Sequence, residues 1–183
     1  SGFLTPIDVG LFDMIYTLGS GSCLSEDMIQ FEVFELPIIN AGSDIEICIG
    51  DIATLQGSAT GGSNNYTSVE WTPNTYIQDG FSFTDLIEPE STQNLTLTVT
   101  DSNGCLNSDN TVVVVHPLPI VEAGENLVLC NQAIPEILTG FSPISSSNGS
   151  GEWSGMGVSS SGEFIPSDVE NIYLTYTFTT QYG

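Results

Sequence analysis

The sequence predicts an all-β protein made of tandem sandwich modules, each with two packed sheets. Three observations predict it. One phrase occurs twice, as LPIINAGSDIEIC at Leu36–Cys48 and as LPIVEAGENLVLC at Leu118–Cys130, 82 residues later. Several short segments alternate apolar and polar residues with the period of two that is typical of strands. Turn sequences rich in Gly, Asn, Ser and Asp separate these segments, and no segment has a convincing helical period.

Two repeat registers divide the chain into modules. A shift of 82 residues aligns Cys23 with Cys105 and Glu70-Trp71 with Glu152-Trp153, and a shift of 160 aligns residues 1–23 with 161–183 without a gap. We therefore expect three modules joined by short Leu-Pro linkers. They are the C-terminal half of a module at 1–35, a complete module at 36–117, and a module lacking its last strand at 118–183.

The alternation places the strands within these modules. It predicts strands at 52–56, 68–72, 81–86, 94–100, 111–116 and 173–179. In Asn94–Thr100, for example, Leu95, Leu97 and Val99 alternate with threonines, which predicts one buried face. About seven short strands with one tryptophan per module is the outline of an immunoglobulin-like sandwich. Trp71 and Trp153 are accordingly predicted to fill the space between the sheets rather than to stack on sugars.

The chain has no Lys or Arg and 23 Asp and Glu residues, which gives a formal net charge of -23. Nucleic acids and anionic membranes attract proteins through basic side chains, so neither is an expected partner. No apolar run reaches the roughly 20 residues that span a bilayer, so membrane insertion is not expected either. Without basic partners, the carboxylates must be solvated, accept hydrogen bonds from backbone N–H groups, or be matched by external cations such as Ca²⁺.

Four cysteines in such a β-rich chain indicate an oxidising, extracellular setting. Cys48 and Cys105 lie near the two ends of the complete module, and we predict a disulfide between them. In the chain-entropy model, closing this loop would stabilise the module by roughly 4 kcal/mol. Metal binding by the cysteines is disfavoured because the sequence has no Cys-x-x-Cys pair and only one histidine.

Other candidate sites are weaker. Asp44, Glu46, Asp51 and Asp101 are candidate calcium ligands, although DSNGC at 101–105 also fits an Asx turn that leads into the last strand. Tyr66 and Tyr76 are candidate ligand-binding aromatics, because they are expected to be exposed beside Gly- and Asn-rich loops. No catalytic residue is predicted: a Ser-His-acid arrangement would have to use His116, and there is no Gly-x-Ser-x-Gly motif.

Several motifs in order, SATGGSNNYTSVEWTP, TVTDSNGC, VVVHPLP and GEWSGMGVSSSGEFIPSD, resemble the PKD-like and SprB-type repeats of giant surface proteins of gliding Bacteroidota. The WDFGDG core of true PKD domains is absent. The resemblance implies a secreted cell-surface adhesin or filament, exported by a type IX system and in some relatives linked to gliding motility. Its partners would be neighbouring modules of the same long chain or filament.

Two functional hypotheses follow. The first is a structural and adhesive array that acts as a semi-rigid acidic rod, since prolines limit linker freedom and like charges repel. In one variant, the open half-modules complete one another between neighbouring chains by strand addition. The alternative is a carbohydrate-binding or accessory module of a secreted polysaccharide-degrading enzyme, with surface glycans as ligands.

Overall fold

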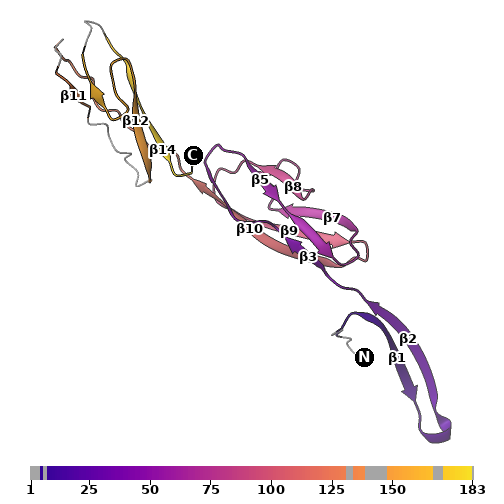
Figure 1. Ribbon diagram of the computed structural model, residues 1–183. Coiled ribbons are helices and arrows are strands. Elements are labelled where there is room, and N and C mark those ends of the chain that lie inside the picture. Colours follow the sequence, from indigo (N-terminus) through magenta and orange to yellow (C-terminus); the bar gives the residue numbers. More distant parts are fainter. Residues whose placement is uncertain (1–4, 6–7, 131–133, 139–147, 167–170, 183) are drawn as a thin grey trace. The chain divides into compact units, whose positions relative to one another are not determined.

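The computed structural model confirms the all-β prediction (Figure 1). It describes the chain except for residues 1–4, 6–7, 131–133, 139–147, 167–170 and 183. In the described residues, one 3-10 turn, η1 (Gly21–Cys23), interrupts a series of strands. No helix among them has the length and apolarity needed to cross a membrane. The chain forms two compact units: unit 1 is Ser1–Ile45 with Gly50–Val114, and unit 2 is Glu46–Ile49 with Val115–Gly183.

The first element of unit 1 is a long hairpin. Strands β1 (Gly10–Leu18) and β2 (Ser25–Val33) pair antiparallel from Gly10↔Val33 to Leu18↔Ser25. Phe12 stacks on Phe31 with ring centroids 5.6 Å apart. Because side chains alternate between the two faces of a strand, this pairing gathers one apolar face. Its members are Phe12, Met14, Tyr16, Leu18, Ile29, Phe31 and Val33.

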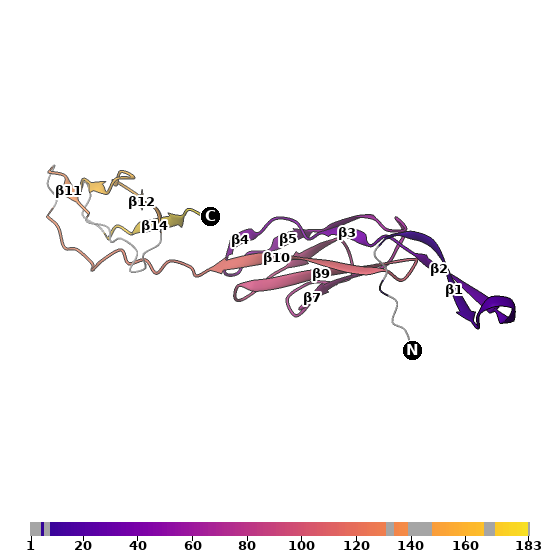
Figure 2. The same ribbon diagram turned by 90° about the horizontal axis from the view of Figure 1, so that it is seen from below.

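The complete module contains eight strands. They are β3 (Pro37–Asn40), β4 (Ile45–Cys48), β5 (Ala53–Gln56), β6 (Ser58–Gly61), β7 (Tyr66–Thr72), β8 (Thr84–Ile87), β9 (Gln93–Asp101) and β10 (Leu106–His116). The main sheet has the order β4-β10-β9-β7, while β5 pairs with β8 and β3 with β6. Figure 2 shows β9 beside β10 and β7. This is an immunoglobulin-like β-sandwich, as predicted.

The core of this module lies where alternating apolar side chains meet. In β9, Leu95, Leu97 and Val99 are buried and the threonines between them are not, which confirms the predicted alternation. Trp71 pairs with Leu97 across the sheet and is fully buried. Its Nε1–H donates to the Ser82 carbonyl at 2.9 Å, so its one polar group is satisfied. The prediction that the tryptophan fills the core is confirmed.

Unit 2 repeats part of this arrangement. β12 (Gly149–Gly155) pairs with β14 (Leu174–Thr180), and β11 (Glu136–Ile137) pairs with β13 (Glu163–Phe164). Trp153 is buried and lies opposite Tyr176, as Trp71 lies opposite Leu97. β12 and β14 are therefore the counterparts of β7 and β9. Residues 127–130, which align with β4, form no strand.

The structure differs from the predicted elements in several places. Ser58–Gly61 belongs to a Gly- and Ser-rich stretch of the kind expected to form turns, but it forms β6, because it pairs with β3 along its whole length. The strand predicted at 81–86 begins only at Thr84, because Gly80 accepts a hydrogen bond from Trp71 and turns the chain there. Pro37, read as part of a linker, opens β3 and is buried. The linker before the complete module therefore ends at Leu36, which is exposed.

Leu97→Ala should destabilise the complete module by about 3 kcal/mol, because it leaves a cavity beside Trp71. Leu86→Ala is the matched control: Leu86 is in β8 of the same module but is 42% exposed, so its loss should be below about 1 kcal/mol. Urea unfolding followed by circular dichroism measures both. Equal losses in the two variants would contradict the assignment of Leu97 to the core.

Candidate functional site

The most distinctive chemistry of the chain is a set of aspartates that accept hydrogen bonds from backbone N–H groups. Asp101 ends β9 and is 1% exposed. Its Oδ1 accepts from the N–H groups of Asn103 and Cys105, and its Oδ2 from that of Ser63, each at 2.9 Å. The bond to Asn103 is the Asx turn that DSNGC predicts, and Gly104 completes it with a φ of 83°. One carboxylate thus ties the β9–β10 turn to the loop after β6.

These bonds set the charge state of Asp101. Burial alone raises the pKa of Asp101, but the N–H groups of Ser63, Cys105 and Asn103 together outweigh burial and hold it below its ordinary value. The carboxylate is therefore ionised at neutral pH although no basic side chain is near it. Backbone dipoles do the work that Lys or Arg does in other proteins.

Two more aspartates hold the first turn of the complete module against β10. Asp109 Oδ2 accepts from Ala41 N–H, and Asp44 Oδ1 accepts from Val112 N–H, both at 2.9 Å. The N–H groups of Ala41 and Asn110 lower the pKa of Asp109, and burial offsets part of that effect. Ala41-Gly42 lies between β3 and β4, where Gly42 has a φ of 88°. The connection between β3 and β4, the two strands of the repeated phrase, is therefore fixed by a carboxylate of β10.

Asp85 in β8 is buried and does the same for the loop after β7. It accepts from Gly80 N–H at 2.6 Å and from Leu86 N–H at 2.8 Å. Neither Asp85 nor Asp109 is among the candidate residues that the sequence predicted. An aspartate that interrupts the alternation of a strand, as in FTDLI or SDNTV, is the signal that could have found them.

The single histidine lies in unit 2. His116 Nε2 is 2.9 Å from Glu46 Oε2, and its ring stacks on Tyr182 with centroids 3.7 Å apart. This is the one ion pair that the described residues contain, and it forms when His116 is protonated. Its Nε2 and its ring face are both used in these contacts, so His116 links chain segments rather than presenting a base to a pocket.

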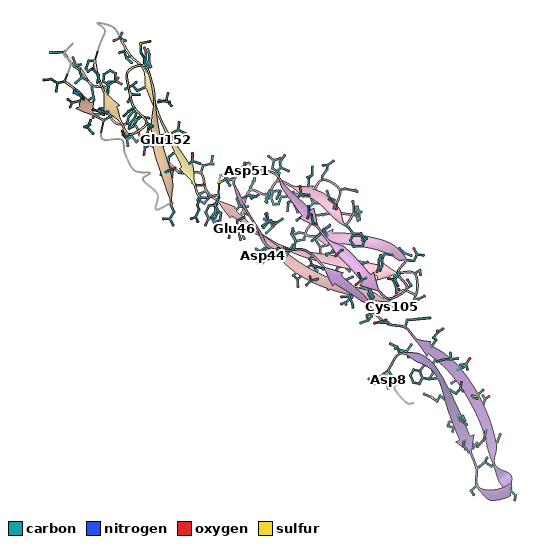
Figure 3. The ribbon with its side chains drawn as sticks, in the orientation of Figure 1. Asp8, Asp44, Glu46, Asp51, Cys105 and Glu152 are labelled. Atoms are coloured by element: carbon teal, nitrogen blue, oxygen red, sulfur yellow. The ribbon has the colours of Figure 1, made fainter. Side chains whose placement is uncertain are left out.

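The four candidate calcium ligands are not brought together. Asp44 accepts a hydrogen bond from Val112 N–H, and Glu46 is hydrogen-bonded to His116. Asp101 accepts hydrogen bonds within the β9–β10 turn. Figure 3 shows Asp44, Glu46 and Asp51 along the chain that contains β4. Within the described residues, no three His, Cys, Asp or Glu side chains are grouped as a metal site.

The predicted Cys48–Cys105 disulfide is wrong. Cys105 directly precedes β10, whereas Ile49, next to Cys48, donates its N–H to the carbonyl of His116, the last residue of β10. Eleven residues of strand separate the two ends, roughly 35 Å, and a disulfide needs Cα atoms within about 7 Å. No disulfide joins any of the cysteines in the described part of the chain. Cys48 is buried instead, with its Sγ 3.8 Å from Thr180 Oγ1.

The two tyrosine candidates are both half-buried, not exposed as expected. Tyr66 packs edge-on against Phe83, and its hydroxyl donates to the Gly61 carbonyl at 3.2 Å. Tyr76 lines an open hollow of about 430 Å³ whose other walls include Ile52, Ile77 and Leu86. Of the two, Tyr76 has the better position to meet a ligand.

Unit 2 contains a second hollow, a groove of about 230 Å³. Its apolar walls are Leu127, Leu129, Leu138, Trp153, Phe164, Pro166, Ile172 and Leu174, and Ala123, Gly124, Glu125 and Asn126 complete it. The repeat predicted that the module at 118–183 lacks its last strand. It did not predict this groove, because a groove depends on how segments that are distant in the sequence pack together.

Comparison with known proteins finds similar solved structures and no family. No protein-family model and no curated protein matches the chain. It is similar to the PKD domain from the KIAA 1837 protein, with 22% identity over 49% of this chain and 92% of that domain and a TM-score of 0.34. It is also similar to DIP-gamma Ig1–Ig2, with 17% identity over 62% of each chain and a TM-score of 0.35. A third similar structure is Dpr2 Ig1–Ig2 in complex with DIP-Theta Ig1–Ig3, with 13% identity over 91% of this chain and 61% of that chain and a TM-score of 0.40.

Asp101 and Asp109 should make the complete module sensitive to acid. Because folding lowers both pKa values, their stabilisation is complete above an unfolded pKa of about 4 and is lost as the pH falls through the folded values. Thermal melting between pH 7 and pH 2 should show a falling melting temperature below about pH 4.

The matched variants are Asp101→Asn and Asp79→Asn, since Asp79 is exposed in the same module. Asp101→Asn should lower the melting temperature at pH 7 by roughly 5 °C or more and flatten the acid decline, whereas Asp79→Asn should do neither. A wild-type melting temperature that is constant down to pH 2 would contradict this role.

Proposed function

We propose that the chain is a repeat segment of a large secreted cell-surface adhesin or extracellular filament, in which its modules act as a semi-rigid acidic spacer. The observation that carries the proposal is the repeated module itself. Trp71 opposite Leu97 and Trp153 opposite Tyr176 are the same strand pair built twice. Proteins that repeat one sandwich module in series use it mainly to extend and to present surfaces.

The charge of the chain supports the same proposal. With no Lys or Arg and a net charge of -23, neighbouring modules repel one another and stay solvated. Acidic side chains that the structure places at turns are satisfied by backbone N–H groups, so the fold needs no basic residues. Such a surface is suited to remaining extended outside a cell, as in the PKD-like and SprB-type repeats that the sequence resembles. Export by a type IX system and a part in gliding belong to this proposal.

A second candidate function, a glycan-binding accessory module of a secreted polysaccharide-degrading enzyme, is favoured by one observation. Tyr76 lines an open hollow with apolar walls in the complete module, and tyrosine rings can stack on sugar faces. Binding on a glycan array that is lost in Tyr76→Ala but kept in Tyr66→Ala would favour this candidate over the spacer.

Surface exposure on living cells tests the main proposal. Antibodies raised against the 183-residue chain should label intact producing cells, and brief treatment of these cells with proteinase K should remove the signal. A cytoplasmic marker protein must survive the same treatment. Labelling that appears only after lysis would overturn the proposal.

A further inference from the structure

The hollow beside Tyr76 lies on a small sheet of three chain segments in the complete module. β5 pairs with one edge of β8, and residues 76–78 pair with the other edge. Glu88 N–H donates to the Tyr76 carbonyl at 3.1 Å, and Gln78 N–H donates to the Leu86 carbonyl at 2.9 Å. This register places Tyr76 directly opposite Glu88, with their Cβ atoms about 5 Å apart.

Alternation along β8 and the residue after it separates buried from exposed side chains. Ile87 is 1% exposed and faces the core, whereas its neighbours Leu86, which is 42% exposed, and Glu88 lie on the outward face. Ile52 directly precedes β5, lies opposite Glu88 by the register Ala53↔Ile87, and is 62% exposed. The outward face therefore combines a tyrosine ring, two aliphatic side chains and a carboxylate. All four line the open hollow of about 430 Å³, and ligand sites in proteins have volumes of about 300–1,000 Å³.

The charge of this face favours a cationic ligand. Glu88 lies among the apolar walls, and the exposed Asp51 and Asp79 adjoin the lining residues Ile52 and Gln78 in the chain. A neutral ligand that covered Glu88 would take a carboxylate out of water without a compensating charge. A cation would instead be attracted both by the carboxylates and by the face of the tyrosine ring.

We propose that this hollow receives an arginine side chain from a partner protein. The guanidinium group is a planar fork that pairs with a carboxylate through two N–H groups and also stacks on aromatic rings, so Glu88 and Tyr76 suit it together. Its aliphatic stem would lie on Leu86 and Ile52. The chain has no Lys or Arg, so a second copy of it cannot supply this group, and the partner must carry an exposed arginine of its own.

Arginine fits this hollow better than lysine for a geometric reason. The lysine ammonium is a compact, strongly hydrated point charge, whereas the guanidinium is flat and more weakly hydrated. Tyrosine and arginine are also the residue types that supply much of the affinity at protein interfaces. The inference goes beyond the spacer role, because it gives the complete module a specific protein partner, and it competes with the glycan candidate for the same hollow.

Titration of the ¹⁵N-labelled 183-residue chain, followed by NMR, tests this proposal. The probe is a short acetylated Gly-Ser peptide with a single arginine, and the matched peptides carry citrulline or lysine in its place. Citrulline keeps the shape of arginine without the charge, and lysine keeps the charge without the planar fork. At about 150 mM salt, which screens nonspecific attraction, the arginine peptide should shift the amide signals of residues 76–78 and 86–88. It should bind several-fold more tightly than either matched peptide.

Substitutions then locate the contact. Glu88→Gln and Tyr76→Ala should each weaken binding of the arginine peptide by about five-fold or more, because each removes one of the two groups that hold the guanidinium. Tyr76→Phe keeps the ring and should bind as the wild type does. Glu70→Gln is the matched control: Glu70 is exposed in β7 of the same module and does not line the hollow, so this variant loses the same charge and should keep full binding. Thermal melting checks that each variant is folded.

Three results would overturn the proposal. The first is a lack of localised shifts with the arginine peptide at about 5 mM, which fills most of a site with a Kd of about 1 mM. The second is equal binding of the citrulline or lysine peptide, and the third is an equal effect of Glu88→Gln and Glu70→Gln.

Neutral oligosaccharides are the probe for the competing ligand. If they bind at this hollow, with an affinity that Glu88→Gln leaves unchanged, the hollow belongs to glycans and the arginine proposal is overturned. Surface labelling of cells is independent of these results, so the proposed function and the arginine site can fail separately.

Discussion

The structure depends on the hydrogen bond between a carboxylate and a backbone N–H group. In a chain without Lys or Arg, a buried or half-buried aspartate has no basic partner, and only hydrogen bonds to its charged form can keep it ionised. Asp101 and Asp109 each meet this condition, and Asp85 also accepts hydrogen bonds from backbone N–H groups. Asp101 ties the β9–β10 turn to the loop that precedes β7, and β7 pairs with β9 so that Trp71 lies opposite Leu97. The acidic composition is therefore part of how the module folds as well as a surface property.

Much of the fold follows from the sequence, because strand periodicity and repeated residues are local signals. The alternation of Leu95, Leu97 and Val99 and the single tryptophan per module predicted the core correctly. Pairing between distant segments was harder to predict. Ser58–Gly61 has a turn-like composition and becomes β6 only because β3 lies beside it. The disulfide prediction was wrong because it used only the positions of the two cysteines in the sequence. In the structure, Cys105 directly precedes β10, whereas Cys48 lies beside the last residue of that strand.

The candidate sites were predictable only where one segment carried the whole signal. DSNGC predicted its Asx turn, since Asp101, Asn103 and Gly104 suffice to form it. The groove of unit 2 could not be predicted from one segment, because its walls include residues 123–129 and part of β14, which are far apart in the sequence.

The most direct test of the central interaction is the titration of individual carboxyl groups by NMR, following the side-chain ¹³C resonances of the aspartates from pH 7 to pH 2. The account predicts that Asp101 and Asp109 titrate below the ordinary aspartate range, since backbone N–H groups lower both pKa values. Midpoints for these two residues at or above that range would show that burial, and not the N–H groups, governs their charge, and would contradict the account.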